Sequence, residues 1–233
     1  MKAFFFDLDD TLYNQLQPFQ AAYDSIFSRI TDISILELFK KSREYSDRVF
    51  AQTESGEMSL EAMHQYRMIN AFKDFGYTIS PAEADAFQKA YKENQYKVSL
   101  IPEMKNILHY LNSKQISMYV TTNGPSSHQR LKIASLEIEQ WIPQTHIFIS
   151  SEVGIAKPHK GFFEYVNRKT KTTSTDSFMV GDSFENDIIG ADQAGWNSIW
   201  INTKNKPRDV ETIRPTYEAV SYQQLENMIY KLI

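Results

Sequence analysis

The carboxyl-terminal part of the chain, from about residue 101, alternates short apolar runs with segments of helical character. The apolar runs are ISMYVT (116–121), THIFIS (145–150), SFMVGD (177–182) and NSIWIN (197–202). Helices are expected at 102–113, 125–136, 160–169, 184–194 and 222–232. Strands that alternate with helices predict an α/β fold, with a parallel sheet covered by helices on both faces.

The amino-terminal segment KAFFFDL (2–8) is expected to be the first strand of the same sheet. Strands buried on both faces of a parallel sheet are continuously apolar, which accounts for three consecutive phenylalanines.

Residues 15–99 have a different character, because apolar residues recur at helical spacing and no convincing strand is present. Ser34 and Glu37 have the spacing of a capping box, as do Ser80 and Glu83, with Pro81 between them. We therefore expect two domains. Residues 1–14 and 100–233 form the α/β core, and residues 15–99 form a helical domain inserted after its first strand.

The composition narrows the class of protein. The 233 residues carry a net charge of −4, so no basic surface for a nucleic acid polymer is expected. No apolar run reaches the roughly 18 residues of a membrane helix, and Ala3 to Phe6 is too short for the core of a signal peptide. Cysteine is absent, which excludes disulfides and thiolate nucleophiles. These features favour a cytoplasmic protein without a membrane partner.

Polar residues follow each of the first four strands, at the edge of a parallel sheet where ligands bind. In chain order they are Asp7, Asp9, Asp10 and Thr11, then Thr122, Asn123 and Gly124, then Lys157, and finally Asp182, Ser183 and Asp187. Carboxylates about 4 Å apart repel by roughly 1 to 4 kcal/mol, so the acidic cluster calls for a cation among its members.

This combination indicates phosphoryl transfer. Carboxylate oxygens are preferred ligands of Mg²⁺, and Asp7 and Asp182 on adjacent strands would form such a site. A carboxylate can also be a covalent nucleophile. Thr122 and Lys157 could hold the phosphoryl oxygens, together with the free N–H groups of the helix that starts near Pro125.

The motifs FDLDDT (6–11), TTNG (121–124), GIAKP (154–158) and GDSFEND (181–187) resemble, in order, the four motifs of the haloacid dehalogenase superfamily. The resemblance covers the whole α/β core. It implies a Rossmann-like sheet, and the helical insert is similar to the type 1 cap domain of that superfamily.

The resemblance implies roles for individual residues. Asp7 matches the nucleophile and Asp9 the general acid/base, whose backbone carbonyl also ligates Mg²⁺. Asp7, Asp9 and Asp182 would thus be the metal ligands. The residues expected to bind the phosphate are Thr122, Asn123, Gly124 and Lys157. Those expected to support the site from behind the metal ligands are Thr11, Ser183 and Asp187, and Asp187 would support either the waters on the metal or Lys157. Asp10 replaces a glycine of many relatives, and we expect it to form hydrogen bonds in its loop.

The leading hypothesis is a Mg²⁺-dependent phosphomonoesterase that hydrolyses a nucleotide 5′-monophosphate or a sugar phosphate through an aspartyl-phosphate. Asp9 argues against a dehalogenase, because a leaving halide needs no proton. The motifs are most similar to the branch with pyrimidine 5′-nucleotidases and N-acylneuraminate-9-phosphatases. A phosphoglycolate-type phosphatase, a signalling receiver without turnover and an inactive binding protein stay open, as do a monomer and a homodimer.

Three further residues carry expectations that a structure can test. Arg48 and Arg67, in the helical insert, are expected to have ordinary surface roles, although either could reach a substrate. Trp200, in NSIWIN, is expected to pack in the core of the sheet.

Overall fold

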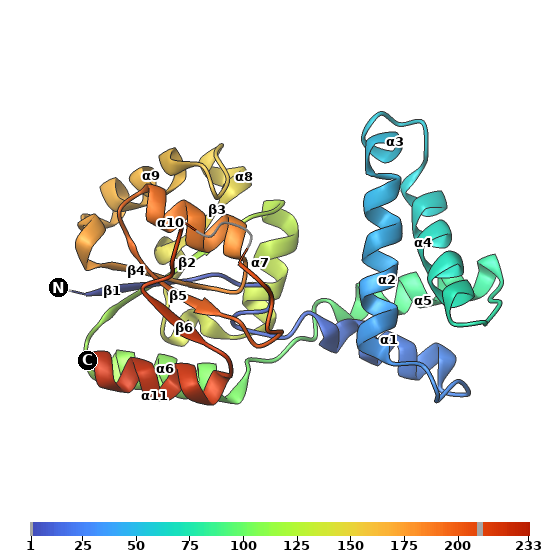
Figure 1. Ribbon diagram of the computed structural model, residues 1–233, viewed down its shortest axis with the longest axis horizontal. Helices are drawn as coiled ribbons and strands as arrows, with labels where there is room; N and C mark the ends of the chain where they lie inside the picture. Colours follow the sequence, from blue (N-terminus) through green and yellow to red (C-terminus); the bar gives the residue numbers. More distant parts are fainter. Residues whose placement is uncertain (1, 209–211) are drawn as a thin grey trace. The chain divides into compact units, whose positions relative to one another are not determined.

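The computed structural model describes residues 2–208 and 212–233, without the side chains of residues 50 and 54. The chain forms two compact units. The core unit comprises Met1–Asn14 and Ser99–Ile233, and the helical unit comprises Gln15–Val98 (Figure 1). Each unit is described by itself.

The core unit is built on a six-stranded sheet in which every neighbouring pair of strands is parallel. The strand order is β3-β2-β1-β4-β5-β6, so the amino-terminal strand lies in the middle. The strands are β1 (Ala3–Phe6), β2 (Ser117–Thr122), β3 (Ile147–Ile149), β4 (Ser177–Gly181), β5 (Asn197–Ile201) and β6 (Tyr217–Ala219). The predicted α/β fold class is confirmed.

Helices cover both faces of this sheet, as the parallel arrangement requires. On one face α6 (Pro102–Ser113) packs against α11 (Tyr222–Leu232), and α8, α9 and α10 lie on the other (Figure 1). The remaining bounds are α7 (Ser126–Ser135), α8 (Ser150–Val153), α9 (Lys160–Thr170) and α10 (Gly190–Gln193).

The three phenylalanines of β1 fill the core on both sides of the sheet. Phe5 stacks on Tyr119 with ring centroids 4.7 Å apart, whereas Phe4 stacks on Phe178 at 5.2 Å. All three are fully buried. Burial of each large apolar side chain contributes about 1.5 to 3 kcal/mol, so this strand anchors the sheet.

The helical unit contains α1 (Leu16–Phe27), α2 (Ile35–Arg48), α3 (Phe50–Glu54), α4 (Leu60–Asp74) and α5 (Pro81–Asn94). Its core includes Phe19, Phe27, Phe72 and Phe87, each at most 1% exposed. At α5 the predicted capping box forms, with Ser80 and Glu83 exchanging hydrogen bonds. At α2 the Ser34 hydroxyl accepts a hydrogen bond from the backbone N–H of Glu37, which is one half of the expected pair.

The structure differs from the sequence predictions at several boundaries. Strand β6 was not predicted, because it has only three residues and one buried side chain, which is too short for a recognisable apolar run. The helix expected at 184–194 is a π-helical segment, Phe184–Ile189, followed by α10. Strand β1 ends at Phe6, so Asp7 and the residues after it lie in a loop where strand alternation no longer orients side chains.

The expectation for Arg67 was wrong. Its side chain is only 7% exposed, because it lies between α4 and the neighbouring helices and donates to Ser46 and Gln88. Arg48 is exposed, as expected. Trp200 is fully buried in β5, which confirms its place in the core of the sheet. Within the described ranges, no helix combines the length and the apolar character needed to cross a membrane.

Candidate active site

The loops after β1, β2 and β4 meet at one edge of the sheet, because parallel strands end on the same side. Asp7 directly follows β1, and its backbone N–H donates to the carbonyl of Val180 at 2.9 Å, which fastens the loop to β4. Thr122 is the last residue of β2. Asp182 follows Gly181, the last residue of β4.

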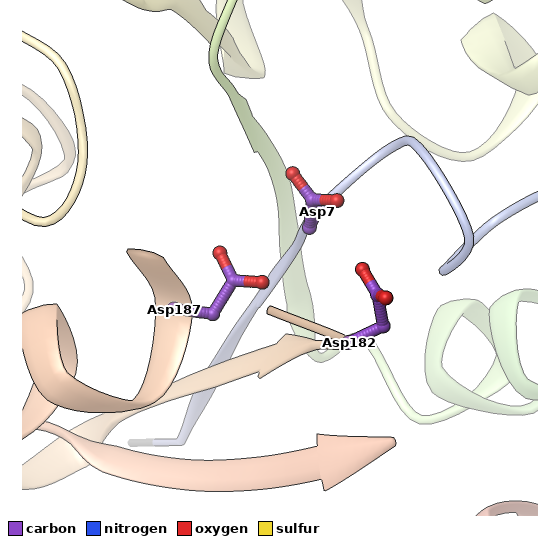
Figure 2. A group of neighbouring side chains, drawn as sticks. All are labelled: Asp7, Asp182 and Asp187. Atoms are coloured by element: carbon purple, nitrogen blue, oxygen red, sulfur yellow. The ribbon is translucent and has the colours of Figure 1, made fainter. Parts of the chain in front are cut away.

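Three carboxylates converge at this edge. Asp7, Asp182 and Asp187 each present an oxygen atom, and these atoms all lie within 4.8 Å of one another (Figure 2). Gly181 permits the approach, since a Cβ atom there would lie 2.1 Å from Oδ2 of Asp187. The sequence predicted that Asp7 and Asp182 would meet, and the structure brings Asp187 to the same place.

Lys157 reaches this cluster from the loop after α8. Its Nζ donates to Oδ1 of Asp7 at 2.8 Å, to Oδ1 of Asp187 at 2.6 Å and to the carbonyl of Thr121 at 2.8 Å. All three protons of the ammonium group are thus used. Burial opposes the charge of Lys157, but Asp187 and Asp7 outweigh it and raise its pKa.

The acids of the cluster are desolvated. Burial raises the pKa of Asp7 to about 7, with Lys157 acting in the opposite direction. Burial, and then repulsion from Asp7, raises the pKa of Asp182 to about 6. The pKa of Asp187 is also raised by burial. Lys157 pairs with Asp7 and Asp187, whereas the cations that act on Asp182 are Lys206 and Lys204, which are partly exposed, so the buried part of the cluster holds more carboxylates than ammonium groups.

A divalent cation fits this donor set. Carboxylate oxygens are the ligands that Mg²⁺ prefers, and its positive charge would offset the repulsion among the three carboxylates. Asp182 is the accessible member, since its side chain is 19% exposed and its carboxylate lies 3.4 Å from Lys206 Nζ at the rim. The hydroxyl of Thr11 is fully buried and has no hydrogen-bond partner among the described residues, and its support of the metal stays a prediction.

The carboxylate of Asp9 has a different set of partners. Oδ1 accepts from Lys132 Nζ at 2.7 Å and from the hydroxyl of Tyr13, and Oδ2 accepts from Gln129 Nε2 at 3.1 Å. Burial would raise the pKa of Asp9, but Lys132 with the other donors lowers it. Asp9 is therefore an ionised, firmly held carboxylate beside the cluster.

Gln129 and Lys132 are site residues that the sequence analysis missed. Both lie on α7, three residues apart and hence on one face of the helix. The sequence could have identified both as site residues from their position, which is one to two helical turns after TTNG on a helix expected to start at the site. Gln129 also donates to Thr122 Oγ1 at 2.7 Å, which leaves the hydroxyl proton of Thr122 available to another acceptor.

Asn123 and Gly124, the last two residues of TTNG, connect the loop after β2 to neighbouring segments. Asn123 Nδ2 donates to the carbonyl of Lys157 at 2.8 Å, and its Oδ1 accepts from the Lys157 N–H at 3.0 Å. The N–H of Gly124 donates to Ser150 Oγ at 3.0 Å. In this arrangement both residues position Lys157 and α7, and their contact with a phosphate stays a prediction.

Asp182 and Asp187 are also held by their surroundings. The indole N–H of Trp200 donates to the carbonyl of Asp182 at 3.0 Å. The N–H of Ser183 donates to Oδ2 of Asp187 at 3.1 Å, and Ser183 Oγ caps the following helical segment by accepting from Asn186. These bonds fix the two acids before any ligand arrives.

Asp10 has a loop role in the structure. Its φ is +54°, a left-handed conformation that glycine adopts freely and aspartate tolerates. Its carboxylate accepts from Lys204 Nζ at 2.5 Å, and its carbonyl accepts from the Tyr222 hydroxyl at 2.8 Å. This positive φ is a conformation that favours glycine, which fits the expectation that Asp10 replaces a glycine.

Comparison with known proteins decides the family. The model for haloacid dehalogenase-like hydrolases matches residues 4–201. The chain belongs to the haloacid dehalogenase-like hydrolase family. This hydrolase is 26% identical over 230 residues to the putative HAD-hydrolase YfnB of Bacillus subtilis, covering 96% of this chain and 93% of that protein. It is 25% identical to the pyrimidine 5′-nucleotidase PynA of Streptococcus pneumoniae, over 100% of this chain and 96% of the relative.

Solved structures give the same fold for this hydrolase. The crystal structure of YfnB bound to magnesium has a TM-score of 0.69 at 24% identity, covering 98% of both chains. A dehalogenase has a TM-score of 0.74 at 14% identity, covering 98% of this chain and 96% of its own. At these identities the likeness concerns the fold alone.

Proposed function

We propose that this hydrolase is a Mg²⁺-dependent phosphomonoesterase that works through an aspartyl-phosphate on Asp7. The observation that carries the proposal is the convergence of Asp7, Asp182 and Asp187, with Lys157 bonded to Asp7 and Asp187. We assign the helical unit the role of the family's cap domain. Nucleoside 5′-monophosphates are the first substrates to test, because the relative PynA is a pyrimidine 5′-nucleotidase, and sugar phosphates follow.

Asp7 is the proposed nucleophile. Lys157 binds its Oδ1, which orients the carboxylate and leaves Oδ2 for attack on phosphorus. The bond from Oδ2 to phosphorus forms as the bond from phosphorus to the ester oxygen breaks. The departing oxygen of an alkyl ester is strongly basic and takes a proton from Asp9, which is ionised in the free site and must first bind that proton from water.

Hydrolysis of the aspartyl-phosphate reverses the role of Asp9. As a carboxylate it accepts a proton from water while the water oxygen bonds to phosphorus and the bond from phosphorus to Asp7 breaks. Inorganic phosphate leaves, Asp7 is a carboxylate again, and Asp9 carries the proton that the next leaving group needs or releases it to water. Thr122 donates its hydroxyl proton to a phosphoryl oxygen, and Lys157 contributes its charge beside it.

Asp7 and Asp182 would hold the magnesium ion, with Asp187 at its side. When bound, the ion supplies positive charge against the carboxylates and the phosphoryl oxygens. Asp9 favours a phosphatase over a dehalogenase within this family, since only the phosphate ester has a leaving group that needs a proton.

The test is release of inorganic phosphate from p-nitrophenyl phosphate and from a panel of nucleoside monophosphates and sugar phosphates, with and without Mg²⁺. We expect Asp7→Asn to abolish turnover and Asp192→Asn, a matched change at an exposed acid on α10, to leave it intact. Full activity of Asp7→Asn would refute the covalent mechanism. Failure of every ester in the panel would refute the phosphatase.

A further inference from the structure

A turn after strand β5 brings two lysines to the acidic edge of the sheet. Residues 202–206, with the sequence NTKNK, directly follow the last residue of β5. Lys206 Nζ lies 3.4 Å from Oδ2 of Asp182, and Lys204 Nζ lies 2.5 Å from Oδ2 of Asp10. These ammonium groups reach the catalytic loops from a strand that supplies none of the four sequence motifs.

The side chain of Asn202 fixes the backbone of Lys206. Its Oδ1 accepts from the N–H of Lys206 at 2.7 Å, and its Nδ2 donates to the carbonyl of the same residue at 3.1 Å. Asn202 is itself buried, and it is attached to β6, since its Nδ2 donates to Glu218 at 2.8 Å and its N–H donates to the carbonyl of Ala219 at 2.8 Å. The side chain of Lys206 therefore starts from a fixed point of the sheet.

Strand β5 and the turn after it contact Asp182 in two ways. The indole N–H of Trp200 holds the backbone carbonyl of Asp182 at 3.0 Å. Lys206 instead contacts the carboxylate, which is the part of Asp182 proposed to hold magnesium. An ammonium group and a metal ion at this position must share the same carboxylate.

The two lysines that contact the acidic cluster differ in burial. The side chain of Lys157 is 1% exposed and pairs with Asp7 and Asp187, so it cannot leave them without stranding a buried charge. The side chain of Lys206 is 47% exposed. Water can solvate its ammonium group when the ion pair opens, so this pair is weak and can be exchanged.

We propose that Lys206 sets the magnesium affinity of the site by competing with the ion for the carboxylate of Asp182. The incoming ion either displaces the ammonium group or binds beside a like charge, and both cost affinity. Lys206 has this role only if magnesium binds Asp182, as the proposed function requires. Lys204 should have a smaller effect, because it pairs with Asp10, which is not a proposed ligand.

The test is calorimetric titration of the full-length protein with MgCl₂, after EDTA treatment and dialysis, at low ionic strength. Lys206→Met should lower the magnesium Kd roughly two- to fivefold, the range expected for loss of one partly exposed charge. Lys206→Arg retains the charge and should keep the wild-type Kd. The control is Lys114→Met, which removes an exposed lysine just before β2, at the opposite edge of the sheet, and should also keep it.

Salt separates an electrostatic role from a structural one. The Kd ratio of wild type to Lys206→Met should fall toward one between about 0.01 M and about 1 M KCl, because the screening length shrinks from about 30 Å to about 3 Å. A ratio that does not fall, or a Kd of Lys206→Met at low salt that is not below the wild-type value, overturns the proposal. A gain of affinity in Lys206→Arg equal to that in Lys206→Met also overturns it, since the charge would then not be the cause.

The outcomes distinguish this role of Lys206 from the proposed reaction. If the wild-type protein binds magnesium and all variants share its Kd, only the role of Lys206 is refuted. If the variants rank as expected and no ester in the panel releases phosphate, only the phosphatase is refuted. If no protein in the series binds magnesium, both are refuted.

Discussion

Replacement of Asp182 by asparagine should stabilise the metal-free protein in a pH-dependent way. Burial and repulsion from Asp7 raise the pKa of Asp182 from 3.8 to about 6. A group with a raised pKa in the folded state favours folding below its unfolded pKa, and this contribution disappears as pH rises through the folded value. At 1.36 kcal/mol per pKa unit, the ionised side chain costs about 3 kcal/mol above pH 6.

The expected result follows from that magnitude. Asp182→Asn removes the charge and retains the shape, so it should raise the free energy of unfolding by up to about 3 kcal/mol at pH 8 and by almost nothing at pH 4. The assay is urea denaturation in EDTA, followed by tryptophan fluorescence. Trp141, Trp196 and Trp200 all lie in the core unit, so the signal reports on the domain that contains Asp182.

At pH 8, magnesium should make the wild-type protein more stable than Asp182→Asn. A metal at a thousandfold excess over its Kd stabilises the wild-type protein by about 4.1 kcal/mol, which exceeds the advantage of up to about 3 kcal/mol that the variant has without metal, and the variant should gain much less from the metal. Asp192→Asn, at an exposed position of the same unit, is the control and should show neither effect. Destabilisation by Asp182→Asn at pH 8 in EDTA, or an equal change at both pH values, would refute the electrostatic reasoning.

Three further substitutions test other parts of the site. Lys157→Met leaves two buried carboxylates without a counter-charge and should lower the free energy of unfolding by about 3 to 5 kcal/mol in urea titrations without metal. An unchanged free energy of unfolding would contradict the stabilising role of Lys157. Lys132→Met removes the cation that holds the carboxylate of Asp9. It should reduce kcat for an alkyl phosphate about tenfold more than kcat for p-nitrophenyl phosphate, because the leaving group of the latter needs no acid. Equal losses of kcat for the two substrates would argue against an effect through Asp9. Gly181→Ala places a methyl group against Asp187 and should lower the free energy of unfolding by about 1 to 3 kcal/mol, measured by thermal unfolding. An unchanged free energy of unfolding would show that the loop can shift to accommodate the methyl group.

The sequence was sufficient for the architecture because the sheet depends on local patterns. Continuous apolar runs such as Phe4 to Phe6 are typical of a strand covered on both faces, and the alternation with helices favours a parallel sheet. Parallel strands end at one edge, so the polar residues after each run had to gather there. The left-handed backbone at Asp10 is also a local property, since it is a conformation that glycine adopts freely and aspartate tolerates.

Only the tertiary structure decided which polar groups share a contact. Lys157 binds both Asp7 and Asp187, and Asp9 turns to Gln129 and Lys132, because the loops and α7 fix the directions of these side chains. Residue spacing carries no information on direction once a strand has ended. The burial of Arg67 was hidden for a related reason. Whether a charged side chain on a helix faces water or neighbouring helices depends on the packing of α2, α4 and α5, which no single helical pattern specifies.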